Sequence, residues 1–166
     1  MTGNARMAFL CVIALAFCLP PVKASDIKRV NVCELLSRPE KFAGQVVSVR
    51  AEVDKSYHWI LLFSKECKGG IMLELRSEIE QKRQCELQKD ETFQKFDKAL
   101  FDFQNGSMDL RNRIRADFEG RFDSVFAKKG NRIVRVAKGY GQKHKAETRL
   151  VLCKVSDVTL LEPAQP

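Results

Sequence analysis

The sequence predicts a mainly β protein with one or two helices, in which five strands close into a barrel. Two long segments alternate apolar and charged residues with a period of two, as strands with one buried face do. Shorter apolar runs between turn residues indicate three more strands. One segment with helical periodicity lies between the third and fourth strands. Alternating strands need a shared interior, and closing the sheet removes edges that would otherwise aggregate.

Length and composition favour one globular domain. The chain has 166 residues, 30% charged and 45% hydrophobic, with a formal net charge of +8. This balance excludes collagenous, low-complexity and multi-span membrane chains. We expect one domain over residues 25–162, since this length suits one hydrophobic core and is short for two, followed by a polar tail over 163–166.

Residues 1–24 predict a secretory signal peptide. Arg6 precedes an apolar run from Met7 to Leu19, and Val22-Lys23-Ala24 carries small residues at the first and third positions before Ser25. The run is too short for a permanent span, which needs roughly 20 apolar residues. We therefore expect cleavage after Ala24, a periplasmic or secreted location, and no membrane span in the mature chain.

The cysteines are interpreted in the context of the predicted export. Cys18 raises the alternative of a lipoprotein, which we disfavour because Phe17 stands where a small residue is wanted before an acylated cysteine. Four cysteines remain after cleavage, an even number that suggests two disulfides with three possible connectivities, or alternatively buried free thiols. They are Cys33, Cys67, Cys85 and Cys153.

We expect no metal site and no cofactor. The chain contains no Cys-x-x-Cys, and its two histidines, His58 and His144, are far apart without the spacing of metal ligands.

The first half of the mature chain predicts a short helix and three strands. Asn31 and Glu34 are typical of a helix start, and Pro39 ends the predicted helix Val32–Ser37. The first strand runs from Gln45 to Asp54 and places Val47, Val49, Ala51 and Val53 on one face. The second runs from Trp59 to Ser64, and the third contains Ile71, Leu73 and Leu75 after a Gly69-Gly70 turn.

The second half predicts a helix and two strands. The helix spans about Glu78–Gln104, ends before Asn105-Gly106, and carries an apolar stripe that we interpret as core packing: Leu87, Phe93, Phe96, Leu100 and Phe103. The fourth strand alternates from Ile114 to Phe122, and we interpret its Asp117 and Glu119 as compensated surface charges rather than an acid/base pair. The last strand, Leu150–Val158, is predicted to place Val151, Cys153 and Val155 on one face.

Three strands, a helix and two strands follow the order of a five-stranded Greek-key OB-fold barrel with its helix between strands 3 and 4. In this arrangement the helix would close one barrel end with its phenylalanines.

Short motifs at both ends of the predicted domain carry a family resemblance. They are Cys33-Glu34-Leu35-Leu36, Pro39-Glu40-Lys41-Phe42, Gly44, Val47–Val53, Phe118–Phe122, Gly139-Tyr140-Gly141, Leu150–Leu152 and Val155–Val158. On these residues the chain resembles exported bacterial proteins of unknown function with a predicted OB-fold of the tRNA-anticodon-binding-like type. The resemblance implies architecture and compartment more than activity, and it implies that Cys33 pairs with Cys67 and Cys85 then with Cys153. Ala51 and Gln142 stand where that family commonly has glycine and histidine, and the second departure weakens any metal or acid–base role for the Gly-x-Gly loop.

OB-folds bind extended ligands on one sheet face and on the loops after strands one and four. Here these loops are Lys55–His58, beside Trp59, and the basic stretch Lys128–Arg149, which contains eight basic residues and one acid, Glu147. Cations meet phosphates while flat rings stack on bases or sugar faces. The candidate ligand-binding residues are Tyr57, Trp59, Lys138, Tyr140, Lys143 and His144, with a core position as the alternative for Trp59.

We therefore expect a non-enzymatic binding or interaction module of the cell envelope, with an anionic envelope component or a partner protein as its ligand. Binding of single-stranded nucleic acid is the alternative, which export disfavours. An envelope enzyme is the second alternative. The chain lacks Gly-x-Ser-x-Gly, His-Glu-x-x-His and a phosphate-binding glycine loop, so we assign no catalytic residue.

Overall fold

The structure is a computed structural model that describes residues 27–55, 59–75, 85–101, 103–104, 107–108 and 113–161. The elements are β1 (Lys28–Asn31), α1 (Val32–Ser37), α2 (Pro39–Phe42), β2 (Gln45–Lys55), β3 (Ile60–Phe63), β4 (Ile71–Glu74), α3 (Glu91–Phe101), β5 (Phe103–Gln104), β6 (Ser107–Met108), β7 (Arg113–Ser124), β8 (Phe126–Lys129), β9 (Arg132–Arg135), a 3-10 turn (Gln142–His144) and β10 (Thr148–Leu161). The predicted signal peptide 1–24, Tyr57, the Asn105-Gly106 stop and the tail 163–166 lie outside the described residues.

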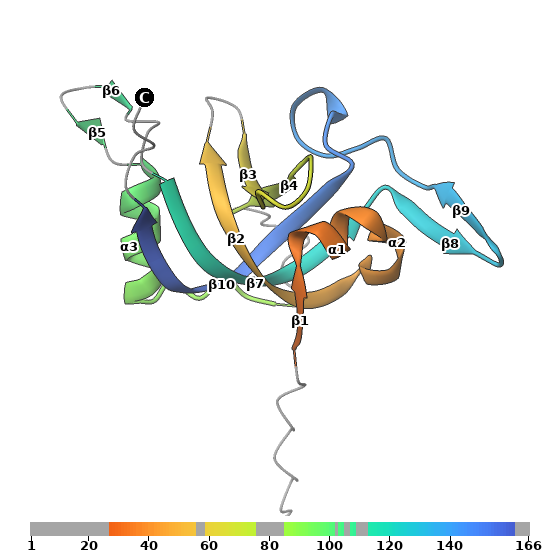
Figure 1. Ribbon diagram of the computed structural model, residues 1–166, viewed down its shortest axis with the longest axis horizontal. Helices are drawn as coiled ribbons and strands as arrows, with labels where there is room; N and C mark the ends of the chain where they lie inside the picture. Colours follow the sequence, from red (N-terminus) through yellow and green to blue (C-terminus); the bar gives the residue numbers. More distant parts are fainter. Residues whose placement is uncertain are drawn as a thin grey trace, which may run out of the picture.

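Five strands close into a barrel (Figure 1). β2 pairs antiparallel with β3 and with β7, β3 pairs antiparallel with β4, β4 runs parallel to β10, and β10 pairs antiparallel with β7. The circuit β2-β3-β4-β10-β7 thus returns to β2, which is the strand order of an OB-fold. Because α3 separates β4 from β7 along the chain, the predicted fold class is confirmed.

The barrel interior holds the apolar residues that the alternation predicts. Val47, Val49, Ala51 and Val53 of β2, with Ile114, Ala116, Phe118 and Phe122 of β7, are each at most 5% exposed. Gly120 interrupts this series because β10 passes close to it, and a Cβ there would collide with the carbonyl oxygen of Val151. The clearest two-residue alternation in the sequence therefore belongs to β2 and β7, the two strands whose pairing closes the barrel.

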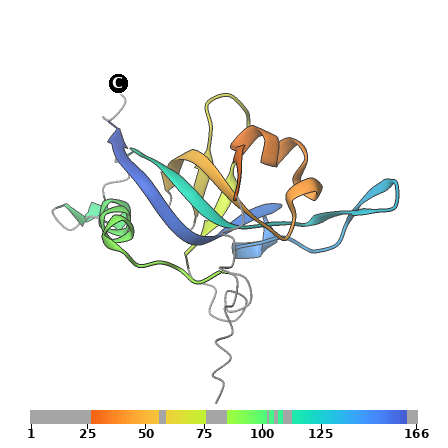
Figure 2. The ribbon, with the colours of Figure 1, turned by 90° about the horizontal axis from the view of Figure 1, so that it is seen from below.

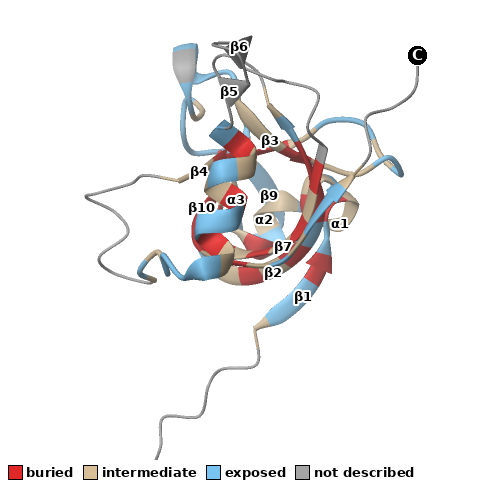
Figure 3. Cartoon of the chain, turned by 90° about the vertical axis from the view of Figure 1, so that its left-hand side faces the viewer, coloured by how far each residue is buried: buried red, intermediate tan, exposed pale blue. Residues whose placement is uncertain are grey.

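Helix α3 covers one end of the barrel (Figure 3). Phe93, Phe96 and Leu100 are buried, and the Phe96 ring meets Phe118 edge to face with 5.5 Å between centroids. At the far end of the helix the Lys55 ammonium donates a hydrogen bond to the Leu100 carbonyl, and burial lowers the pKa of Lys55. The helix therefore closes the barrel end as predicted.

The helix is shorter than the predicted Glu78–Gln104. Asp90 accepts a hydrogen bond from the Phe93 amide at 2.9 Å and so begins the helix at Glu91. Residues 85–90 are not helical, because the Gln88 amide donates to the Cys153 carbonyl at 2.7 Å and Cys85 is tied to β10. Phe103 belongs to β5 rather than to the helix.

Two disulfides attach flanking segments to the barrel. Cys33 pairs with Cys67 and joins α1 to the β3–β4 turn, while Cys85 pairs with Cys153 and joins the segment before α3 to β10. The Cα atoms are 5.6 Å apart in each pair. The connectivity implied by the family resemblance is confirmed, and the alternative of free thiols is wrong.

The first helix forms as predicted. The Asn31 side chain accepts a hydrogen bond from the Glu34 amide at 2.7 Å, and α1 ends at Ser37. Pro39 then begins α2, because its fixed φ suits the first position of a helix. Gly44, with φ of +79°, turns the chain into β2.

β1 and β10 both differ from the prediction. β1 was not predicted, and it pairs in parallel with residues 47–50 of β2. Further along the same edge of β2, residues 52–55 pair with β3. In β10 the pairing register shifts at Cys153, as in a β-bulge, which changes the face that following residues present. The core therefore receives Leu150, Leu152 and Val155, instead of Val151, Cys153 and Val155.

The basic connection contains a hairpin that the sequence patterns did not predict. β8 and β9 pair antiparallel and project from the barrel at the end away from α3 (Figures 1 and 2). Gly130, with φ of +59°, lies at the tip. Among the helices that the structure describes, none has the length and apolarity that a membrane crossing requires.

Charged side chains on the outside of the barrel pair across neighbouring strands. Arg50 lies 3.3 Å from Asp117 and 2.8 Å from Asp157, and the hydrogen bond to Asp157 together with the charge of Asp117 raises the pKa of Arg50. Asp117 also pairs with Arg29 at 3.2 Å. The prediction that Asp117 is a compensated surface charge is confirmed, with partners on β1 and β2 rather than on its own strand.

Candidate functional site

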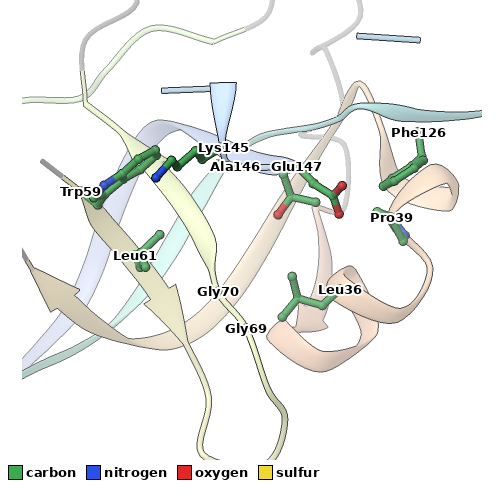
Figure 4. A pocket seen from close by; sticks show the side chains of 11 residues that line it. Leu36, Pro39, Trp59, Leu61, Gly69, Gly70, Phe126, Lys145, Ala146 and Glu147 are labelled. Carbon is green, nitrogen blue, oxygen red and sulfur yellow. The ribbon is translucent and has the colours of Figure 1, made fainter. Parts of the chain in front are cut away.

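A pocket of about 460 Å³ lies beside Trp59 on the outside of the barrel (Figure 4). Its apolar walls come from five side chains on α1, α2, β8 and the β3 region: Leu36, Pro39, Trp59, Leu61 and Phe126. Lys145 and Glu147, in the segment before β10, supply the charged groups. The pocket therefore combines a flat ring, aliphatic surface and one charge of each sign.

One wall of the pocket is fixed covalently. The Cys33–Cys67 disulfide joins α1, which carries Leu36, to the turn that contains Gly69 and Gly70. A Cβ on Gly69 would lie 3.7 Å from Leu36 Cδ1, so the turn backbone packs against that side chain. The disulfide thus holds two pocket segments together.

Residues 139–146, called here the 139–146 loop, lie over Trp59. A Cβ on Gly141 would lie 2.6 Å from Trp59 Cζ3 and 2.7 Å from Met72 Sδ, closer than such atoms approach in proteins. Gly141 also takes φ of +68°, which favours glycine. Trp59 is therefore partly covered by the loop backbone, and the remainder of the side chain faces the pocket.

The loop is closed by its own hydrogen bonds. The Tyr140 amide donates to the Ala146 carbonyl at 2.8 Å, and the Ala146 amide donates to the Tyr140 carbonyl at 3.2 Å. Lys143 and His144 take φ of 56° and 53°, which residues with side chains adopt rarely. Such conformations persist only where surrounding contacts hold them, so the loop presents its exposed side chains from a fixed backbone.

Arg149 forms the base beneath Tyr140. Its guanidinium lies 4.5 Å from the centre of the Tyr140 ring and binds Asp123 at 2.9 Å and Glu74 at 2.8 Å. Asp123 also binds Arg121 at 2.9 Å. Arg149 is therefore a neutralised support of the loop rather than part of the unbalanced positive charge.

Arg135 anchors the hairpin to the segment before β10. It binds Glu147 at 2.9 Å and donates to the carbonyl oxygens of Ala137 and Lys138 at 3.2 and 2.9 Å. Its guanidinium lies 5.7 Å from the centre of the Phe126 ring. Glu147, the only acid of the basic stretch, is thus already neutralised within the chain.

The remaining basic side chains of the stretch are exposed and form no ion pair within the described residues. We call them the basic surface: Lys128, Lys129, Arg132, Lys138, Lys143 and Lys145. Lys145 lines the pocket together with Trp59, and Figure 4 shows its side chain extending toward the ring. Positive charge therefore reaches the pocket beside an acid, Glu147, that Arg135 already binds.

The structure brings together four of the six predicted ligand-binding residues. Trp59 lies outside the core cluster and beneath the loop that carries Tyr140, Lys143 and His144, so its alternative core position is wrong. His144 is exposed, and its Nδ1 lies 3.2 Å from the Gly139 carbonyl. Lys138 lies at the base of the loop, where its carbonyl accepts from Arg135. Tyr57 and His58 lie outside the described residues.

The apolar walls of the pocket were not evident from sequence patterns. The sequence pattern places Leu36 in a short helix and Pro39 at its end, and Phe126 follows the predicted fourth strand without a periodic pattern. In the part of the chain that the structure describes, no three His, Cys, Asp or Glu side chains are grouped as metal ligands.

Comparison of the chain with known protein families, curated proteins and solved structures found no match. Function is therefore inferred from the pocket, the loop and the basic surface.

Proposed function

We propose that this chain is a non-enzymatic binding module of the cell envelope, located in the periplasm, whose basic surface binds an anionic envelope ligand. The observation that carries this proposal is the set of six exposed cations on the hairpin and the 139–146 loop region, which have no ion-pair partner among the described residues. Their only acidic neighbour in the basic stretch, Glu147, is bound by Arg135. Unbalanced positive charge of this kind attracts anions over the range of electrostatic screening.

The pocket supports a ligand with an apolar or flat part beside its negative charge. Trp59, Leu61 and Phe126 offer apolar surface, and Lys145 lines the same pocket. Aromatic rings stack on sugar faces, while ammonium groups meet carboxylate and phosphate oxygens. An acidic glycan or a phosphorylated amphiphile fits this combination.

An oxidising compartment supports the location. Disulfides persist in the periplasm and outside the cell and are rare in the cytosol, and this chain holds two. The predicted signal peptide 1–24 leads to the same compartment.

The position of the 139–146 loop favours an envelope ligand over nucleic acid. OB-folds hold single strands across the second and third barrel strands, which are β3 and β4 here. In this chain Gly141 packs on Met72 of β4 and on Trp59 at the start of β3, so part of that face is occupied.

The proposal is tested with two soluble polyanions, heparin and inorganic polyphosphate, bound to the oxidised protein. Affinity should fall steeply between about 50 and about 300 mM salt, because exposed charges are screened over this range. Replacing Lys143 and Lys145 by glutamate should weaken binding roughly ten-fold or more. Lys89→Glu with Lys98→Glu is the matched control, since both lysines are exposed and lie outside the basic surface. An affinity for both polyanions that is unchanged by salt and by both pairs of substitutions would refute the proposal.

A further inference from the structure

The distal half of the β8–β9 hairpin stands clear of the barrel (Figures 1 and 2). Its attachment lies at its base, where Arg135 binds Glu147 and the Val136 amide donates to the Val125 carbonyl at 2.7 Å. Toward the tip, Lys129 pairs with Arg132 in the ladder and Lys128 with Ile133. An isolated two-stranded hairpin has little stability of its own, so the anchored base keeps this one extended.

The tip combines three cations with an exposed aliphatic side chain. Lys128, Lys129 and Arg132 are exposed, and Ile133 is 59% exposed beside them. Val136, at the base, is 51% exposed. Among the described residues only four large hydrophobic side chains are exposed, and two of them belong to this hairpin and its base.

A dissolved anion would bind the exposed cations of the hairpin but would leave the Ile133 side chain in contact with water. A bilayer surface accounts for both, because lipid phosphates attract Lys and Arg while an aliphatic side chain enters the boundary between headgroups and acyl chains. Ile133 lies opposite Lys128 in the ladder, so these two side chains share one face of the hairpin and reach such a surface together. The hairpin carries no acidic residue from Phe126 to Arg135 that would oppose the approach.

We infer that the β8–β9 hairpin docks this module on a bilayer of anionic phospholipid, with Ile133 entering the headgroup region. The inference rests on the proposed function, since it identifies the anionic ligand of the basic surface as the phosphates of a lipid surface. The inference assigns a role to Ile133, whose apolar side chain a soluble polyanion would not contact. Substitution of Ile133 therefore distinguishes docking on lipid from binding of a soluble polyanion.

The test is co-sedimentation of the oxidised chain without the predicted signal peptide, residues 25–166, with unilamellar vesicles. Vesicles of equal parts phosphatidylglycerol and phosphatidylcholine should bind the protein, and pure phosphatidylcholine vesicles should not. Ile133→Ser should lower the partition coefficient about ten-fold, since it removes most of the apolar contact. Lys128→Gln and Lys129→Gln should each lower it about five-fold.

Leu160→Ser is the matched control, because Leu160 is 55% exposed and lies on β10. It should bind vesicles like the wild type. Unchanged thermal unfolding in every variant would show that the exposed substitutions leave the fold intact.

Two results would overturn the inference and leave the proposed function standing. One is Ile133→Ser binding anionic vesicles as tightly as the wild type while the lysine variants bind weakly, which indicates a purely ionic site. The other is a wild-type protein that binds polyphosphate or heparin but not the vesicles. Failure to bind vesicles and both soluble polyanions would refute the inference and the proposed function together.

Discussion

Replacement of Gly141 by alanine tests the contact between the 139–146 loop and Trp59. The new Cβ would lie 2.6 Å from Trp59 Cζ3 and 2.7 Å from Met72 Sδ, well inside the separation of about 3.5–4.0 Å at which carbon atoms attract. Trp59 directly precedes β3, and Met72 is paired within the sheet. We therefore expect the loop backbone to move away from the ring.

The magnitude has two parts. A side chain at φ of +68° costs about 1–2 kcal/mol, and the steric displacement adds about 1–3 kcal/mol, as overpacking does elsewhere. The free energy of unfolding should thus fall by about 2–5 kcal/mol. Gly44→Ala is the control, because Gly44 has φ of +79° and its new Cβ would meet no atom of another segment within 4 Å, so only the backbone cost applies.

Tryptophan fluorescence reports the local change, because Trp59 is the only tryptophan of the chain. In Gly141→Ala the emission should shift to longer wavelength and acrylamide should quench it more efficiently. Gly44→Ala should keep the wild-type spectrum. Urea denaturation followed at the same wavelength gives the free energy of unfolding for both variants.

Equal losses of stability in the two variants, with unchanged Trp59 emission, would refute the direct packing of the loop on this ring.

Three other perturbations test the covalent, apolar and ionisable parts of the fold. Replacing Cys33 and Cys67 by serine should lower the free energy of unfolding by about 4 kcal/mol, from the chain entropy of a 34-residue separation, and should shift Trp59 emission as the pocket wall loosens; an unchanged urea midpoint would contradict this. Phe96→Ala should cost about 3–5 kcal/mol in urea denaturation because the ring is fully buried, and a loss below about 1 kcal/mol would be inconsistent with the packing described. Burial lowers the pKa of Lys55 from 10.5, so between the lowered pKa and 10.5 the unfolded chain binds more protons. The stability of the wild type should then rise with pH relative to Lys55→Met, and parallel pH profiles would argue against it.

The long barrel strands were predictable because each keeps one buried face over its whole length. In β2 and β7 every second side chain enters the same core, as Val47 and Phe118 illustrate, and the two-residue period is broken only at Gly120. β10 loses this period at Cys153, where the register shift exchanges the faces. The apolar run Leu150–Cys153 before the shift offers no alternation from which an extra residue could be recognised.

β1 and the β8–β9 hairpin could not be predicted for a different reason. β1 has four residues, and the β8–β9 hairpin is exposed along most of its length. A strand without a buried face has no need for apolar residues at every second position. The run Lys128-Lys129 is therefore charged and shows no two-residue alternation. Their pairing depends on neighbours that are distant in sequence or on a turn at Gly130.

The candidate site was predictable in part. Fold order alone placed Trp59 and the Gly139–Gly141 segment on one side, since loops after the first and fourth barrel strands flank the same face. The pocket walls could not be predicted, because Leu36 and Phe126 meet only through the tertiary fold. Counting basic residues also overstated the available charge, since Arg135 and Arg149 are bound within the chain.

The arrangement of β1 has a consequence for solubility. β1 and β3 cover successive parts of one side of β2, so the strand left outermost there is only four residues long and carries Lys28 and Arg29. Long, flat, uncharged borders are what recruit further chains into fibrils, whereas short cationic ones repel them. We therefore expect β1 to protect concentrated protein from edge-to-edge assembly, although it contributes little to the hydrophobic core.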